Sequence, residues 1–164
     1  MGFPHGANTT NTKVAEAVLA LKSGAKELDM VVNISKVRSH DWQYVLADIK
    51  AINDITHAHK AQLKVIFENA YLNDEEKIKL CEICVSVGTD WVKTSTGYAP
   101  GGATEADVLL MRKHTPPSMQ IKAAGGVRTL KGVLRMRELG CSRVGASATK
   151  AIMDEYRVRF GQAA

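Results

Sequence analysis

The sequence predicts an α/β fold built on a parallel β-sheet. Short runs rich in β-branched residues alternate with amphipathic segments of helical length along nearly the whole chain. The connections are short, and crossover helices are the usual means of joining parallel strands. The chain has 164 residues, 45% of them hydrophobic and 24% charged, which suits one globular domain. Two closures fit this pattern: an open doubly wound sheet or a (β/α)₈ barrel.

Each expected element has a local signal. Strands are expected at 2–4, 27–33, 63–68, 90–94, 119–123 and 143–146, where apolar runs are short and flanked by turn residues. Helices are expected at 11–24, 41–59, 73–87, 104–114, 129–140 and from about 148 onward. The segment 41–59 carries its apolar residues at helical spacing. Asn73, Thr104 and Thr129 are suitable N-cap residues, and Gly88 is a suitable helix end.

Composition and motifs argue against several classes of protein. The net charge of +5 is spread along the chain and only 5% of residues are aromatic, which is a poor footprint for nucleic-acid binding. No apolar run approaches the ~20 residues needed to cross a bilayer, and the start resembles no signal peptide, so we expect a cytoplasmic protein. Cys81 and Cys84 form a CxxC inside an expected helix, where packing on a buried face is the better interpretation. The histidines show no metal-binding arrangement, and we expect no metal site.

Four ionisable residues interrupt apolar strand runs: Asp29, Glu68, Lys93 and Lys122. Lysine is rarely buried without a partner, because removing the ammonium from water is costly. A lysine beside another cation in a pocket of low dielectric loses its proton more readily and can attack a carbonyl. A nearby carboxylate can then move protons. The alternative is a buried network of lysines and carboxylates that only fixes packing.

Glycine-rich segments follow three of these strands. They are TSTGYAPGG after Lys93, AAGGVRT around Gly125, and VGAS at the last strand. Glycine between a strand end and a helix start lets backbone amides approach an anion, although each segment alone is better explained by a tight turn. Since the last two such loops of a barrel frequently form a phosphate site, the set predicts phosphate binding. The residues therefore indicate a Schiff-base enzyme acting on a phosphorylated carbonyl compound.

The sequence resembles the deoxyribose-phosphate aldolase family from residue 2 to about residue 153. The resemblance is carried by GFPHG, LDMVVN, KVIFE, DWVKTSTG, IKAAGGVRT and RVGAS, in that order. It implies a (β/α)₈ barrel and a class I aldolase. Such an enzyme reversibly cleaves 2-deoxy-D-ribose 5-phosphate to D-glyceraldehyde 3-phosphate and acetaldehyde in deoxyribonucleotide catabolism, with no metal or organic cofactor.

The resemblance also implies the site residues. Lys93 would form the Schiff base, Lys122 would be the neighbouring cation, and Asp29 would hold a catalytic water and relay protons. The substrate phosphate would be bound by residues of the glycine loops, namely Gly97, Gly125, Gly126, Val127, Arg128 and Ser147. The partners implied are small phosphorylated sugars and aldehydes, with no nucleic acid and no membrane.

Family members carry two strands and their helices before GFPHG, so residues 1–164 are expected to form a single barrel domain that lacks the first two βα units. About six of the eight strands would be present. An incomplete barrel exposes strand edges, and we therefore expect a homodimer or higher homo-oligomer. One alternative function is a non-catalytic remnant that binds phosphosugars or serves only in assembly. Another is a Schiff-base barrel aldolase with a different aldehyde donor.

Overall fold

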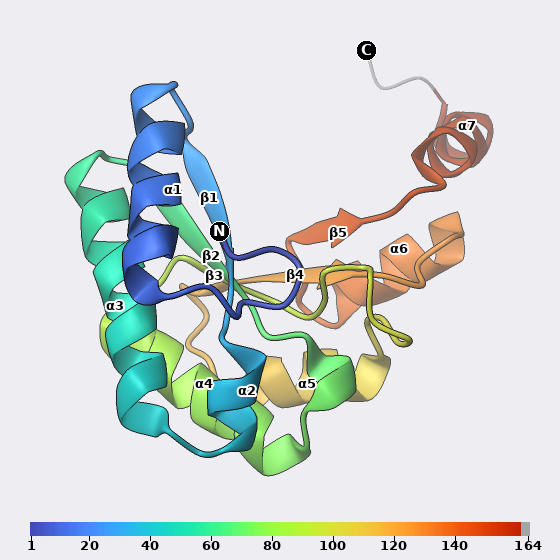
Figure 1. Cartoon of the computed structure of the whole chain (residues 1–164). Helices are drawn as coiled ribbons and strands as arrows, with labels where there is room; N and C mark the ends of the chain where they lie inside the picture. The colour runs from blue at the N-terminus through green and yellow to red at the C-terminus, as the bar shows by residue number, and fades with distance from the viewer. Residues whose placement is uncertain (162–164) are drawn as a thin grey trace.

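Parallel strands and helices alternate along the chain in the computed structural model, which describes residues 1–161 (Figure 1). The elements, in order, are α1 (Thr10–Lys22), β1 (Glu27–Val31), α2 (Ile34–Arg38), α3 (Trp42–Ala58), β2 (Gln62–Ile66), the 3₁₀ turn η1 (Asn69–Tyr71), α4 (Asp74–Val87), β3 (Trp91–Lys93), α5 (Glu105–Lys113), β4 (Gln120–Ala124), α6 (Leu130–Glu138), β5 (Arg143–Gly145) and α7 (Thr149–Phe160). The last three residues of the expected domain lie outside this range.

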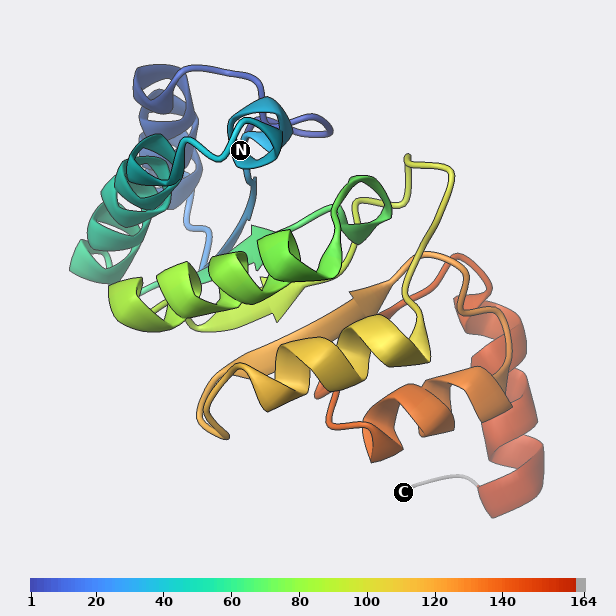
Figure 2. The same cartoon turned by 90° about the horizontal axis from the view of Figure 1, so that it is seen from below.

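The sheet has five strands in the order β1-β2-β3-β4-β5, and every pair is parallel. This order runs in one direction only, whereas a doubly wound sheet reverses at a switch point. Helices α3 to α6 follow one another along one side of the strands (Figure 2). The structure therefore confirms the α/β class and, of the two closures, the barrel type.

The two outer strands of the sheet are linked by an ion pair. Arg143 on β5 donates two hydrogen bonds to Glu27 on β1, from Nη1 to Oε2 at 2.5 Å and from Nη2 to Oε1 at 3.1 Å. β1 and β5 stand at opposite ends of the strand order. The sheet must therefore curve until its first and last strands face each other, which is the curvature of an incomplete barrel.

The core lies between the sheet and the helices. Alternate strand residues such as Met30, Val65, Val92 and Ile121 are fully buried there. Because successive strand residues point to opposite faces, the residues between them point to the concave face. Cys81 and Cys84 on α4 are also fully buried in this core, as expected from their place in a helix. Burial raises the pKa of the Cys81 thiol to about 12.

Helix ends follow the sequence signals closely. Asn73 and Glu76 form a reciprocal capping box at the start of α4, and Gly88 ends that helix in the left-handed conformation. Thr104 and Thr129 cap α5 and α6 with their hydroxyl oxygens. The short helix α2 was not expected from the sequence. Among the described residues, no helix is both long and apolar enough to cross a membrane.

The strand expected at 2–4 is wrong: these residues form a turn, so residues 1–161 contain five strands where six were expected. Gly2 has a φ of +66° and its carbonyl accepts from the amide of Gly6, which turns the chain, and Pro4 has no N–H for a sheet ladder. Met1 instead pairs with β1. Its amino group donates to the carbonyl of Asp29 at 2.5 Å, and the amide of Val31 donates to the Met1 carbonyl at 3.0 Å.

Candidate active site

Lys93 and Lys122 are direct neighbours in the sheet. They lie opposite each other in the register of β3 and β4. The residues that precede them, Val92 and Ile121, face the helix-covered core, so both lysines point to the concave face. The structure therefore brings together two amines that are 29 sequence positions apart and separated by helix α5.

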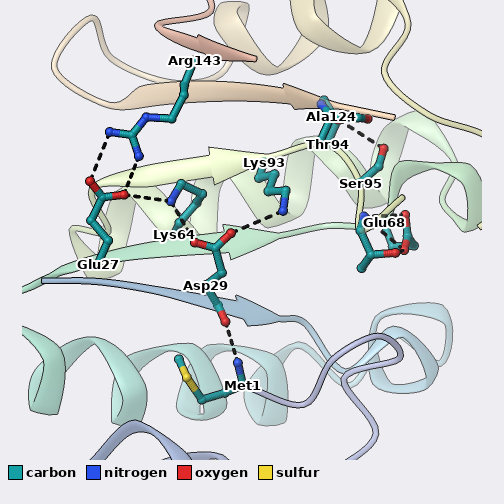
Figure 3. A network of polar contacts seen from close by, with 11 residues as sticks. Met1, Glu27, Asp29, Lys64, Glu68, Lys93, Thr94, Ser95, Ala124 and Arg143 are labelled. Atoms are coloured by element: carbon teal, nitrogen blue, oxygen red, sulfur yellow. Dashed lines mark hydrogen bonds and ion pairs between the residues drawn. The ribbon is translucent and has the colours of Figure 1, made fainter. Parts of the chain in front are cut away.

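Asp29 joins Lys93 on the concave face. Its Oδ2 accepts from the ammonium of Lys93 at 3.3 Å, and its Oδ1 accepts from Lys64 at 2.8 Å. Figure 3 shows both lysines reaching toward this carboxylate. Burial alone would raise the pKa of Asp29, but the hydrogen bond and positive charge of Lys64, together with Lys93 and Lys122, hold it below the ordinary value. Asp29 is therefore a carboxylate poised beside an amine.

Lys93 and Lys122 have different surroundings. Lys93 is only 8% exposed and pairs with Asp29, whereas Lys122 is half-buried and makes no ion pair within residues 1–161. Burial lowers the pKa of Lys122, and the charge of Lys93 lowers it further. The amine of Lys122 therefore loses its proton more readily than that of an ordinary lysine.

Both lysines open into a pocket of about 360 Å³ at the carboxyl ends of β3, β4 and β5. The pocket is also lined by every residue of the expected phosphate set, which is Gly97, Gly125, Gly126, Val127, Arg128 and Ser147. Asp29 does not line this pocket, but it accepts a hydrogen bond from Lys93, which does. The carboxyl ends of parallel strands are where ligands bind in barrels.

The glycines of this pocket have conformations suited to anion binding. Gly97, Gly125 and Gly126 have φ values of +95°, +81° and +80°, in the region that favours glycine. Within residues 1–161 their amides, like that of Ser147, donate to no carbonyl or side chain. Arg128 also lines the pocket, and unpaired amides of this kind form a concavity that attracts phosphate.

Sequence reasoning missed three residues of the concave face: Lys64, Glu27 and Arg143. Lys64 is only 2% exposed and contacts both Asp29 and Glu27, at 2.8 and 3.2 Å (Figure 3). It interrupts the apolar run QLKVIFE just as Lys93 interrupts its own, so the same signal could have identified it. Lys64 matches the alternative of a packing network, whereas Lys122, with no carboxylate partner in the described part of the chain, does not.

Glu68 differs from its expected place in a strand. β2 ends at Ile66, and Glu68 lies two residues further on with a left-handed backbone, φ 59° and ψ 61°. Its carboxylate accepts from the amide and hydroxyl of Thr96. Glu68 therefore supports a loop and does not face Lys93.

A larger groove of about 610 Å³ lies between α6, β5 and α7. Its lining is mainly apolar and includes Val133, Val144, Ile152 and Met153. It contains neither of the two lysines nor any carboxylate. We therefore assign the chemistry to the smaller pocket, where amines and free backbone amides converge.

The sequence and fold are similar to those of known aldolases. A model of the DeoC/LacD family of aldolases matches residues 1–153. The deoxyribose-phosphate aldolase of Rhodopirellula baltica is 54% identical over 164 residues, which are 100% of this chain and 68% of that protein. A solved structure described as QR15, an aldolase, matches with a TM-score of 0.90 at 42% identity over 97% of this chain and 71% of its own. The tetrameric deoxyribose phosphate aldolase of Aeropyrum pernix matches with a TM-score of 0.86 at 28% identity over 96% of this chain and 66% of its own.

Proposed function

This chain belongs to the DeoC/LacD family of aldolases, and on that premise we propose that it reversibly cleaves 2-deoxy-D-ribose 5-phosphate to D-glyceraldehyde 3-phosphate and acetaldehyde. The single observation that carries the mechanism is the pairing of Lys93 with Lys122 across β3 and β4, in one pocket with three glycine loops. This arrangement suits a class I aldolase that acts on a phosphorylated sugar through a Schiff base.

Lys93 is the nucleophile in this proposal. Its neutral amine attacks the C1 aldehyde of the open-chain sugar, and loss of water gives an iminium. The iminium withdraws electrons, so that removal of the C3 hydroxyl proton lets the C2–C3 bond break, with its electron pair forming an enamine. D-glyceraldehyde 3-phosphate leaves, the enamine takes a proton at C2, and water hydrolyses the iminium to release acetaldehyde and the free amine.

Asp29 and Lys122 move protons and charge in these steps. Asp29 already accepts from Lys93 and stays ionised, so it can hold a water beside the reacting carbon and take up or return its proton. Lys122 lies directly across from Lys93 in the sheet and, when protonated, places a second positive charge beside it. Neither role calls for a metal or an organic cofactor.

The glycine loops hold the substrate phosphate in this proposal. Gly97, Gly125, Gly126 and Ser147 line the pocket that both lysines share, and Val127 and Arg128 continue the second loop. Binding the phosphate at one end of the sugar fixes the aldehyde at the other end near Lys93, which lowers the entropic cost of the attack.

We extend the proposal to assembly and location. One matched aldolase is described as tetrameric, and the outer strand β5 has a free edge within the described residues, which supports a homodimer or higher homo-oligomer. The elements from α1 to β5 share one sheet and one continuous core, which supports a single domain. A role in deoxyribonucleotide catabolism in the cytoplasm follows from the proposed substrate.

Product analysis tests the reaction. The protein is incubated with 2-deoxyribose 5-phosphate, and acetaldehyde and glyceraldehyde 3-phosphate are measured by coupled reduction. In the reverse direction, glyceraldehyde 3-phosphate is offered with a panel of donor aldehydes and ketones. The proposal expects acetaldehyde to be the preferred donor. Preference for another donor would point to a different Schiff-base aldolase, and a folded protein that binds phosphate without turnover would point to a non-catalytic remnant.

A further inference from the structure

Glu68 has two features that ordinary packing does not explain. Its side chain is only 2% exposed, yet it carries a carboxylate. Its backbone is left-handed, with φ 59° and ψ 61°, a conformation that is unfavourable for a residue with a long side chain. Strain of this kind persists only where the surroundings impose it, and it is frequent near functional sites.

The carboxylate of Glu68 is committed to one residue, Thr96. Its Oε1 and Oε2 lie 3.1 and 3.3 Å from the amide nitrogen of Thr96, and Oε2 also accepts from the Thr96 hydroxyl. Within residues 1–161 it has no cationic partner. A buried carboxylate is tolerated when such hydrogen bonds replace water, so these contacts are the ones that stabilise Glu68 in its place (Figure 3).

Thr96 connects Glu68 to the phosphate pocket. Thr96 lines that pocket, and its hydroxyl oxygen accepts from the amide of Tyr98 at 3.1 Å. Gly97 stands between these two residues with its φ of +95° and a free amide. Both donors of Thr96, its amide and its hydroxyl, are therefore engaged by Glu68. The Gly97 amide is left as the donor available to an anion.

The start of the same loop is also fixed from the β2 side. The amide of Phe67 donates to the carbonyl of Lys93 at 3.0 Å, and the amide of Asn69 donates to the carbonyl of Thr94 at 2.9 Å. Glu68 lies between these two donors, and its left-handed backbone directs its side chain toward Thr96. The loop is thus held at consecutive points, and Glu68 supplies the last of them before Gly97.

We propose that Glu68 is a positioning residue that holds the turn 96–98 in its anion-binding shape and so sets the affinity of the enzyme for the substrate phosphate. It acts through Thr96 and touches neither the reacting carbonyl nor Lys93. The inference rests on the proposed function, since it assigns a determinant of phosphate recognition within the same site. A change at Glu68 is therefore expected to raise KM only for a substrate that carries the phosphate group.

Kinetics with two substrates tests this assignment. Glu68→Gln keeps the shape of the side chain but replaces the charged acceptor with a neutral amide. KM for 2-deoxyribose 5-phosphate should rise about tenfold while kcat stays within about twofold. With unphosphorylated 2-deoxyribose, kcat/KM should stay within about twofold. The exposed Glu82 on α4 gives the matched control, because Glu82→Gln should leave both substrates unaffected.

Variants of Thr96 provide an independent test if Glu68→Gln folds poorly. Thr96→Val removes the hydroxyl and should reproduce the phosphate-specific rise in KM. Thr96→Ser keeps the hydroxyl and should have a KM close to that of the wild type. Equal losses with both substrates, or a fall in kcat with KM unchanged, would overturn the assignment. Binding of inorganic phosphate, measured by NMR titration, tests the role of Glu68 independently of the proposed reaction. Glu68→Gln should weaken that binding about tenfold even if the wild-type chain shows no turnover, and equal binding by the two proteins would overturn the assignment.

Discussion

The ammonium of Lys93 lies 3.3 Å from Oδ2 of Asp29, although the two residues are 64 positions apart in the chain. The parallel sheet creates this contact, since it places β1 and β3 on either side of β2 with their side chains on the same concave face. An amine next to an ionised carboxylate can exchange protons with it directly or through water. The chemistry of the site depends on that proximity.

Replacing Asp29 with asparagine removes the proton acceptor but keeps the size of the side chain. We expect kcat to fall by about 10²- to 10⁴-fold. Because the pKa of Asp29 is held below its ordinary value of 3.8, the wild-type pH–rate profile should show no inflection from Asp29 above pH 3.8. Steady-state kinetics across a pH series would check both expectations. An unchanged kcat in Asp29→Asn would exclude Asp29 from the proton transfers.

Replacing Lys122 with methionine should separate activity from stability. The pKa of Lys122 is lower in the folded chain than in the unfolded chain, where it has its ordinary value of 10.5. The free energy of unfolding therefore rises with pH in the window below 10.5, and the charged form costs stability at neutral pH. Lys122→Met should lose this pH-dependent rise and unfold at a higher urea concentration than wild type at neutral pH, while kcat falls about 10²-fold. Lys131→Met, at an exposed position of α6, is the control. A variant less stable than wild type at neutral pH would contradict this assignment.

Gly125 and Gly126 should differ in their tolerance of alanine. Both have positive φ, so alanine at either position is strained by about 1 kcal/mol. A Cβ at Gly126 meets nothing within 4 Å, whereas a Cβ at Gly125 would lie 2.9 Å from the Cα of Gly102. Gly125→Ala should therefore lose about 1–2 kcal/mol more than Gly126→Ala, as measured by urea unfolding. Equal losses would show that the two loops do not pack as closely as the structure has them.

The sequence could predict the two pocket lysines and Asp29 because each interrupts an apolar strand, and such an interruption is visible within a few residues. It could predict the helix caps for the same local reason. It could not predict the pairing of Arg143 with Glu27, since that contact spans 116 positions and exists only because the sheet curves. The pairing of Met1 with β1 and the left-handed Glu68 were missed because both depend on partners elsewhere, namely Asp29 and Val31 for Met1 and Thr96 for Glu68.

Trapping of the covalent intermediate tests the central claim most directly. The protein is incubated with 2-deoxyribose 5-phosphate and reduced with borohydride, and the modified residue is located by peptide mass spectrometry. The account predicts an adduct on Lys93 that is absent in Lys93→Met. An adduct on Lys122 instead, or no adduct from a folded sample, would contradict the assignment of Lys93 as the residue that forms the Schiff base.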